Sequence, residues 1–206
     1  AVEAKFDIVD GKVNEFQSSR DGQKVLITET IRDINVALNS GQNQIPLVVE
    51  HVKAQVTTEN INEMGIKEII GVGRSNFVGS PANRRHNIKV GAVAVNGTLI
   101  GPGEEFSLLK TLGEVDAEHG YKQELVIKGN KTTPEFGGGL CQIGTTTFRA
   151  TLASGLPIVE RQSHSYRVSY YEPAGTDATI YFPKPDFRFL NDTGQFILIQ
   201  THMIGN

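Results

Sequence analysis

Residues 136–148 read Phe-Gly-Gly-Gly-Leu-Cys-Gln-Ile-Gly-Thr-Thr-Thr-Phe, and this stretch predicts a glycine-rich turn that runs directly into a helix. Glycine loses more conformational entropy on folding than any other residue. Three consecutive glycines therefore indicate an unusual backbone path or the close approach of another group. The helix is expected over residues 145–153, where apolar residues recur at helical spacing and Gly155-Leu156-Pro157 follows as a stop. Cys141 therefore lies at or just before the first turn of this helix.

Outward from this stretch, the pattern predicts an α+β fold with two parts. Residues 1–72 are expected to form a small N-terminal α+β unit, and residues 73–206 a β-rich mixed domain with a helix after the Gly-Gly-Gly-Leu-Cys-Gln motif. Asn96-Gly97 is a strong hairpin signal and Pro102-Gly103 a second turn. In this domain we expect a loop over 129–139 and strands over 88–95, 124–128, 166–171, 178–182 and 196–202.

The first unit is predicted to alternate strands and helices. Strands over 4–9 and 12–16 would be joined by Asp10-Gly11, and a helix would start near Thr30 and stop at Gly41. Further along we expect a strand within 44–52, a short helix over 57–64 and a strand over 66–72.

Composition narrows the class of protein. The 206 residues include 38% hydrophobic and 21% charged residues, which is typical of a soluble globular chain, and the formal net charge is −3. Basic residues do not dominate, so no nucleic-acid partner is expected. No apolar run approaches the roughly 18 residues of a membrane span. The chain begins without Met or a signal-peptide pattern, which indicates a processing boundary at residue 1 and leaves room for a membrane anchor upstream.

Cys141, the single cysteine, has two interpretations that the residue pattern leaves open. At a helix N-terminus the unpaired N–H groups and the helix dipole favour a thiolate, and N–H groups near Gly139 to Gln142 could hold an oxyanion or a carboxylate. Alternatively, Cys141 lies on one mostly apolar helix face with Thr145, Phe148 and Leu152, as a structural cysteine would.

A cysteine nucleophile needs a base and often a group that orients the base. His164 lies in the polar segment 160–166 between the helix and a predicted strand, where functional side chains are often displayed. Asp177 is the candidate orienting carboxylate, although a simple turn residue would fit the same position.

Metal and cofactor sites are not predicted. Cys141, His164, His119, His86 and Asp177 are chemically suitable zinc ligands, but the chain has no paired Cys or His spacing. Gly71-Val72-Gly73 is followed by Asn76 where a dinucleotide fingerprint requires its third glycine, so that motif fails.

Several blocks stand out between Arg85 and Phe196: Arg85-His86-Asn87-Ile88, residues 96–107, Gly120-Tyr121, residues 137–146, residues 160–165 and residues 175–179. Together these blocks resemble the VanW family. The resemblance is specific because the Gly-Gly-Gly-x-Cys-Gln block occurs together with the Arg-x-x-His and Gly-x-Asp-Ala blocks. It implies an extracellular, envelope-associated location, often behind an N-terminal anchor, and a connection to peptidoglycan. Residues 1–72 are similar to the peptidoglycan-binding module that commonly precedes this domain.

Cys141, His164 and Asp177 all fall within these blocks, which favours the nucleophile interpretation. The first hypothesis is a Cys-His acyl-transfer enzyme, a transpeptidase or amidase, acting on peptide stems of peptidoglycan. Substrate would be bound by Arg85, Gly138, Gly139, Gln142, Thr145 and Arg161. The second hypothesis is a non-catalytic module that binds peptidoglycan or glycan, or serves envelope assembly, with a structural Cys141.

Overall fold

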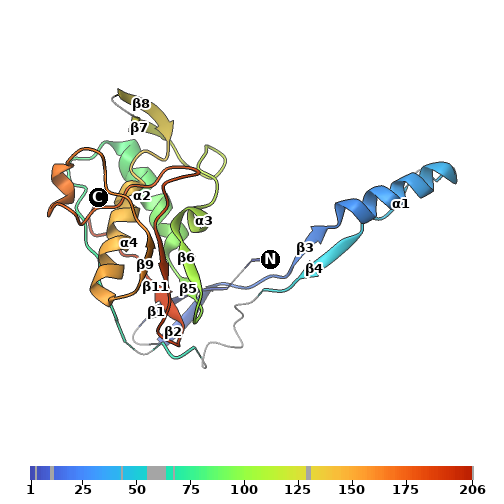
Figure 1. Ribbon diagram of the computed structural model, residues 1–206, viewed down its shortest axis with the longest axis horizontal. Helices are drawn as coiled ribbons and strands as arrows, with labels where there is room; N and C mark the ends of the chain where they lie inside the picture. Colours follow the sequence, from blue (N-terminus) through green and yellow to red (C-terminus); the bar gives the residue numbers. More distant parts are fainter. Residues whose placement is uncertain are drawn as a thin grey trace. The chain divides into compact units, whose positions relative to one another are not determined.

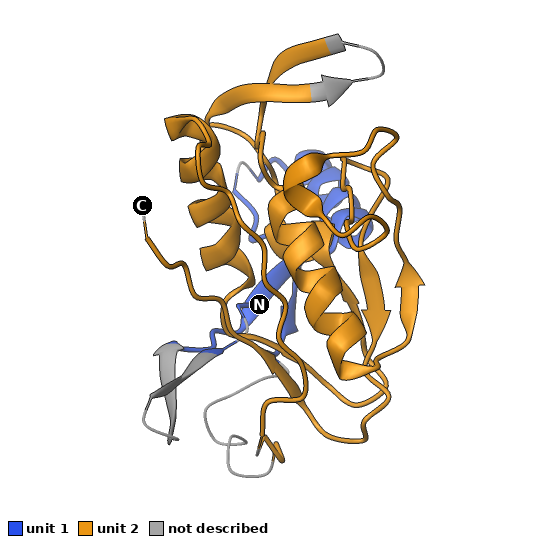
Figure 2. Cartoon of the chain, turned by 90° about the vertical axis from the view of Figure 1, so that its left-hand side faces the viewer, with its two compact units in different colours: residues 1–63 blue, residues 64–206 orange. Residues whose placement is uncertain are grey.

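The computed structural model describes residues 1–206 except 3, 10–11, 43, 55–63, 67, 129–130 and 206. The chain divides into two compact units, Ala1–Glu63 and Met64–Asn206, which are coloured separately in Figure 2. Helices and short strands are mixed in both, so the predicted α+β class is confirmed. None of the described helices has the length and apolarity that crossing a membrane requires.

Among its described residues, unit 1 has two antiparallel strand pairs and one helix (Figure 1). The first pair is β1 (Lys5–Val9) with β2 (Lys12–Gln17), and the second is β3 (Gly22–Val25) with β4 (Val49–Val52). Helix α1 (Ile27–Asn39) connects β3 toward β4 and starts three residues before the predicted Thr30. The Thr30 hydroxyl instead accepts a hydrogen bond from the Val48 N–H at 3.2 Å, which ties the helix to the chain entering β4.

Of three further predictions for this part of the chain, two concern residues that the structure does not describe and one is wrong. The Asp10-Gly11 turn and most of the predicted helix over 57–64 lie outside the described residues. The predicted strand over 66–72 is wrong, because its described residues have no strand partner.

Unit 2 packs helices against short antiparallel strands. Strands β6, β10 and β9 form one sheet in that order, β11 pairs with β5, and β7 pairs with β8. Helices α2 and α4 lie side by side, as Figure 1 shows. The elements in chain order are α2 (Ala82–Val95), β5 (Thr98–Ile100), β6 (Glu105–Ser107), α3 (Leu108–Leu112), β7 (Gln123–Lys128), β8 (Lys131–Phe136), α4 (Cys141–Ser154), β9 (Ile158–Glu160), the 3-10 helix η2 (Ser169–Tyr171), β10 (Arg188–Leu190) and β11 (Ile197–Ile199).

Helix α2 overturns the predicted strand over 88–95. Its buried residues are spaced by three and four positions, at Ile88, Gly91, Ala92 and Val95, whereas Val93 between them is 64% exposed. That spacing is the signature of one helix face, which the high apolar content of this short stretch concealed. Asn96-Gly97 consequently joins a helix to β5 and makes no hairpin between strands.

The remaining differences concern loops and strands near the C-terminal half. The predicted loop over 129–139 contains β8, which pairs with the correctly predicted β7. The predicted strand over 166–171 is wrong, since this segment forms turns and η2. Residues 178–182 make only one isolated bridge, between Gln162 and Thr179, among the described residues. The predicted helix is confirmed as α4, which ends at Gly155 with a φ of 73°.

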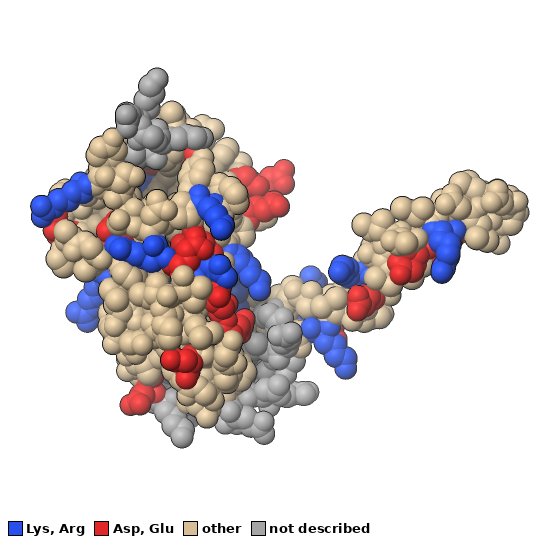
Figure 3. Space-filling model, viewed as in Figure 1, with Lys and Arg blue, Asp and Glu red and all other residues tan. Residues whose placement is uncertain are grey.

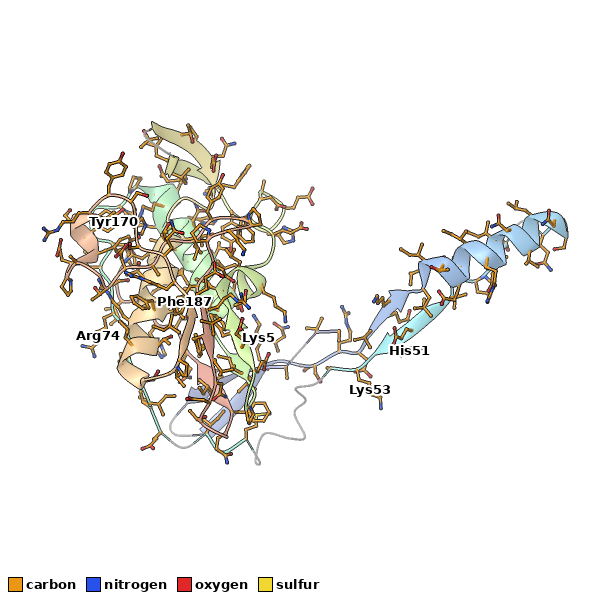
Figure 4. All side chains as sticks on the ribbon, in the orientation of Figure 1. Lys5, His51, Lys53, Arg74, Tyr170 and Phe187 are labelled. Atoms are coloured by element: carbon orange, nitrogen blue, oxygen red, sulfur yellow. The ribbon has the colours of Figure 1, made fainter. Side chains whose placement is uncertain are left out.

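The core of unit 2 lies between α2, α4 and the strands. Phe187, fully buried, stacks edge-on against Phe148 of α4 at a centroid separation of 5.7 Å and also contacts Phe189 of β10. Figure 4 shows Phe187 in the interior of unit 2 and Tyr170 at its surface. On the face seen in Figure 3, Lys and Arg are interspersed with Asp and Glu.

Candidate active site

Cys141 is the first residue of α4, and its half-buried side chain packs against the core of unit 2. The Sγ atom lies 3.5 Å from the Thr179 hydroxyl and 3.6 Å from the Ile180 carbonyl oxygen, toward which the thiol donates. The sulfur is therefore in contact with polar groups as well as with hydrocarbon, at the end of a helix where backbone N–H groups favour an anion.

The three glycines before Cys141 are required by close packing. Gly137 and Gly139 have φ values of 78° and 112°, a region that side chains disfavour. A Cβ on Gly138 would lie 2.8 Å from the Glu124 Cβ, and one on Gly139 would lie 2.8 Å from the Arg84 Cγ. The approach to Cys141 is therefore threaded between α2 and β7, and contact with a substrate at Gly138 or Gly139 stays a prediction.

Backbone N–H groups beside the sulfur differ in availability. The Gln142 N–H donates to the Gly139 carbonyl oxygen at 2.9 Å. Within the described parts of the chain, neither the Gly139 nor the Cys141 N–H donates a hydrogen bond to another group. These two donors are the available groups for an oxyanion near the sulfur.

His164 and Asp177 form a tight pair on the segment after α4. The Nδ1 atom of His164 lies 2.6 Å from Asp177 Oδ2, and the His164 backbone N–H donates to the same oxygen at 2.8 Å. Both side chains are mostly buried. The imidazole also packs against the Tyr171 ring at a centroid separation of 5.2 Å. Two contacts to one carboxylate oxygen fix the ring orientation, and Nε2 is the ring nitrogen that remains for a second partner.

The electrostatics link this pair to the thiol. Burial raises the pKa of Cys141, but hydrogen bonding from His164 and Thr179 outweighs it, so the pKa lies below the ordinary 9.0. Burial lowers the pKa of His164, but hydrogen bonding to Cys141 and Asp177 outweighs it, so the pKa lies above 6.5. The opposite directions favour a thiolate beside an imidazolium, the state that a cysteine nucleophile needs.

Asp177 is held by Arg161, which extends across its backbone and side chain. Arg161 Nε donates to the Asp177 carbonyl oxygen at 2.8 Å, and NH2 lies 3.3 Å from Asp177 Oδ1. The guanidinium also lies over the Phe148 ring at 4.7 Å. These contacts position Asp177, and the predicted binding of substrate by Arg161 stays a prediction.

Thr145 ties the next segment to α4. Its hydroxyl donates to the Ala178 carbonyl oxygen at 3.2 Å and accepts from the Ala178 N–H at 3.1 Å. Because Thr145 is 0% exposed, this predicted substrate-binding residue acts here as a clamp on the segment that carries Asp177 and Thr179.

Of the two adjacent arginines of α2, Arg84 contacts Gln142 and Arg85 does not. Gln142 is buried, accepts from Arg84 NH2 at 2.9 Å and donates to the Asn76 carbonyl oxygen at 3.2 Å. Arg85, predicted to bind substrate, is exposed and donates to the Ser80 carbonyl oxygen at 2.9 Å. Arg84 is the arginine of this helix that reaches the residue next to Cys141.

The sequence analysis gave a role to Arg85, in the block Arg85-His86-Asn87-Ile88, and none to Arg84. On a helix, Arg84, Asn87, Ile88 and Gly91 follow one another at spacings of three, one and three, and therefore share the buried face, whereas Arg85 does not. The helical spacing of buried residues would have identified it.

Arg149 was also missed. Its guanidinium donates to the carbonyl oxygens of Arg74, Tyr171, Glu172 and Thr176, at 2.6–3.1 Å. It thereby fixes on α4 the loop that leads to Asp177. The buried-side position of Arg149, four residues after Thr145 on the helix, was the available signal.

Among the described residues, the side chains that could together hold a metal ion are Glu114, Asp116 and His119. They are largely exposed, and His119 Nδ1 pairs with Asp116 Oδ1 at 2.8 Å. His86, another of the suitable ligands, contacts the Gly120 carbonyl oxygen at 2.7 Å. Neither histidine belongs to the group around Cys141.

Comparison with known proteins places this site in a family. The family model described as VanW like protein matches residues 83–206. The uncharacterised protein YoaR of Bacillus subtilis is 33% identical over 165 residues, which cover 80% of this chain and 54% of that protein. The vancomycin B-type resistance protein VanW of Enterococcus faecalis is 35% identical over 116 residues, 54% of this chain and 42% of that protein. The chain thus spans about half the length of these relatives. No solved structure matches.

Proposed function

This chain belongs to the VanW-like family, and from that premise we propose that it is a cell-envelope enzyme that performs thiol acyl transfer on peptide stems of peptidoglycan. One observation carries the proposal. His164 is held by Asp177 at 2.6 Å and lowers the pKa of the Cys141 thiol at the start of a helix. A nucleophile, a base and an orienting carboxylate are the three parts that such chemistry needs.

The reaction would proceed in two steps. The Cys141 thiolate attacks the carbonyl carbon of an amide, and the oxyanion is stabilised by the N–H groups of Cys141 and Gly139. The His164 imidazolium donates its proton to the departing amine, and a thioester remains. Neutral His164 then accepts a proton from water or from an acceptor amine, which attacks the thioester and releases the thiolate. Water gives hydrolysis, and an amine gives transpeptidation.

The envelope assignment has a different basis from the chemistry. The Enterococcus relative is named for vancomycin resistance, which agrees with a role at the cell envelope. Extracellular location, peptidoglycan as partner, an upstream anchor and a peptidoglycan-binding role for residues 1–72 are part of this proposal and follow from the family resemblance.

Covalent capture tests the reaction directly. Incubation with purified peptidoglycan stem peptides, followed by intact-protein mass spectrometry, is expected to show an acyl adduct on Cys141 that hydroxylamine removes. Cys141→Ala should form no adduct and should keep its circular dichroism spectrum and its thermal midpoint within a few degrees.

Alkylation separates this proposal from the binding module. We expect native Cys141 to react with iodoacetamide near neutral pH, because a lowered pKa supplies thiolate there. Reaction only after denaturation, together with stem-peptide binding that survives in Cys141→Ala, would refute the enzyme and support a non-catalytic module.

A further inference from the structure

We propose that Arg84, with the Tyr170 ring beside it, forms a carboxylate subsite next to Cys141, so that the substrate is an anionic peptide whose free carboxylate lies close to the scissile amide. This inference rests on the proposed function and adds to it the charge of the substrate.

The first support is the set of partners around Arg84. Its NH1 atom donates to the Ser80 hydroxyl at 2.6 Å, and NH2 donates to Gln142 Oε1 at 2.9 Å and to the Tyr171 hydroxyl at 3.3 Å. All of these acceptors are neutral. Within the part of the chain that the structure describes, no carboxylate pairs with Arg84, and its Nε–H has no partner.

The second support is burial. Arg84 is partly buried, with its stem against Gly139 and its guanidinium 5.1 Å from the centre of the Tyr170 ring. An arginine withdrawn from water is normally paired with an anion, because neutral acceptors and a ring face offset the loss of hydration only in part. A carboxylate ligand would complete the charge balance, and the planar guanidinium suits it.

The third support is proximity to the reacting groups. Gln142, which Arg84 contacts, follows Cys141 directly, and Tyr171, which Arg84 also contacts, packs against the His164 ring. Tyr170 is 52% exposed, so one side of this cluster is open to a ligand. Arg84 therefore lies at the accessible edge of the Cys141 site.

The other arginines nearby have their charge or their donors in use. Arg161 is paired with Asp177. Arg149 donates from all three of its guanidinium nitrogens to carbonyl oxygens. Arg85 extends to the Ser80 carbonyl oxygen on the exposed side of α2. Arg84 is the member of this group that is partly buried, has no carboxylate partner among the described residues and keeps an unused donor.

The test compares two small electrophiles of nearly equal size on the native protein. Iodoacetate carries a carboxylate and iodoacetamide does not, and both alkylate the same thiolate, so the ratio of their rate constants cancels any change in thiolate fraction. At low ionic strength the iodoacetate-to-iodoacetamide ratio should fall about threefold to tenfold in Arg84→Gln, as expected for the loss of one charge a few ångströms away. Arg84→Lys should retain part of the preference.

Arg85→Gln is the matched control, because it removes the same charge from the neighbouring position on the same helix. Its ratio should equal that of the wild-type protein, and added salt should lower the ratio in the wild type but not in Arg84→Gln. Equal ratios in all variants, or equal losses in Arg84→Gln and Arg85→Gln, would overturn the subsite while leaving the thiol chemistry intact. Failure of native Cys141 to react with iodoacetamide at all would refute the proposed function, and the subsite with it.

Discussion

At the scale of single residues, the site depends on three side chains that hold one another in place. Asp177 accepts two hydrogen bonds from His164, one from the ring and one from the backbone, so the imidazole has one preferred orientation. The charge of His164 in turn favours the Cys141 thiolate. Each group is therefore expected to change the titration of the others.

The first prediction concerns the titration of the thiol. Because His164 lowers the pKa of Cys141, the pH profile of iodoacetamide alkylation should bend below the ordinary value of 9.0. His164→Ala should move this bend upward and slow alkylation at neutral pH, because less thiolate is then present. His119→Ala, at an exposed histidine, should leave the profile unchanged. An unchanged profile in His164→Ala would contradict the pairing.

The second prediction concerns Asp177 and acid stability. Burial raises the pKa of Asp177, but hydrogen bonding from His164 outweighs it, so the pKa lies below 3.8 in the folded protein. Its stabilising contribution is thus present above the ordinary pKa and lost as the pH falls through the lowered one. Asp177→Asn should therefore show a flatter acid limb in a plot of thermal midpoint against pH. Asp192→Asn, on the surface, is the control, and an equally flat limb in both variants would exclude this role.

At the scale of elements, α4 organises the site with residues from its first turn to its middle. Its first residue is the candidate nucleophile, while Thr145 clamps Ala178 and Arg149 holds the loop before Asp177. The segments that carry Asp177, Thr179 and Ile180 have little strand pairing of their own among the described residues, so these side-chain contacts replace a sheet.

The clamp can be tested with an isosteric change. Thr145→Val leaves the Ala178 N–H without an acceptor in a fully buried place and should lower the free energy of unfolding by about 1–3 kcal/mol. Thr151→Val is the control, because the buried Thr151 hydroxyl donates only to the Thr147 carbonyl oxygen of the same helix. Urea denaturation should show a clearly smaller loss for Thr151→Val, and similar losses would argue against the clamp.

The close packing at Gly139 can be tested by comparing Gly139→Ala with Gly155→Ala. Gly139→Ala would combine a φ of 112° with a Cβ 2.8 Å from Arg84, whereas Gly155→Ala would combine a φ of 73° with open space. Gly155→Ala should therefore cost about 1–2 kcal/mol from the backbone alone. Gly139→Ala should cost about 1–3 kcal/mol more than Gly155→Ala, because the neighbouring atoms must shift to admit the Cβ. Equal thermal midpoints for the two variants would show that the close approach is not tight.

At the scale of the whole molecule, the chain consists of two compact units, and every residue of the candidate site belongs to Met64–Asn206. The family match over residues 83–206 lies within this unit. Its core, built around Phe187, Phe148 and Phe189, contains contributions from helices and strands far apart in the sequence.

The corresponding prediction is that residues 64–206, expressed alone, fold and keep the chemistry of the site. Their thermal transition and iodoacetamide rate constant should match those of the full chain within experimental error, because a unit with its own core folds independently. A fragment that is unfolded, or folded with an unreactive Cys141, would show that residues 1–63 contribute to the site.

The patterns that depend on local chemistry were predictable. Helix α4, β7, β11, the first strand pair and the α+β class were all visible in the spacing of apolar residues and in the turn signals. The strand predicted over 88–95 was wrong because a short stretch that is apolar or glycine except for Lys89 has no clear period that separates a buried strand from a buried helix.

The sequence by itself determined the local features: a helix that follows the glycine-rich turn and ends at Gly155, and the position of Cys141 close to the start of that helix. Only the tertiary structure decided what each neighbour does. Arg161, Thr145 and Gln142 were chosen as binding residues, yet their polar atoms contact Asp177, Ala178 and Arg84. The reason is physical: a side chain's type sets the bonds it can make, but the partner is set by packing between segments that lie far apart in the chain.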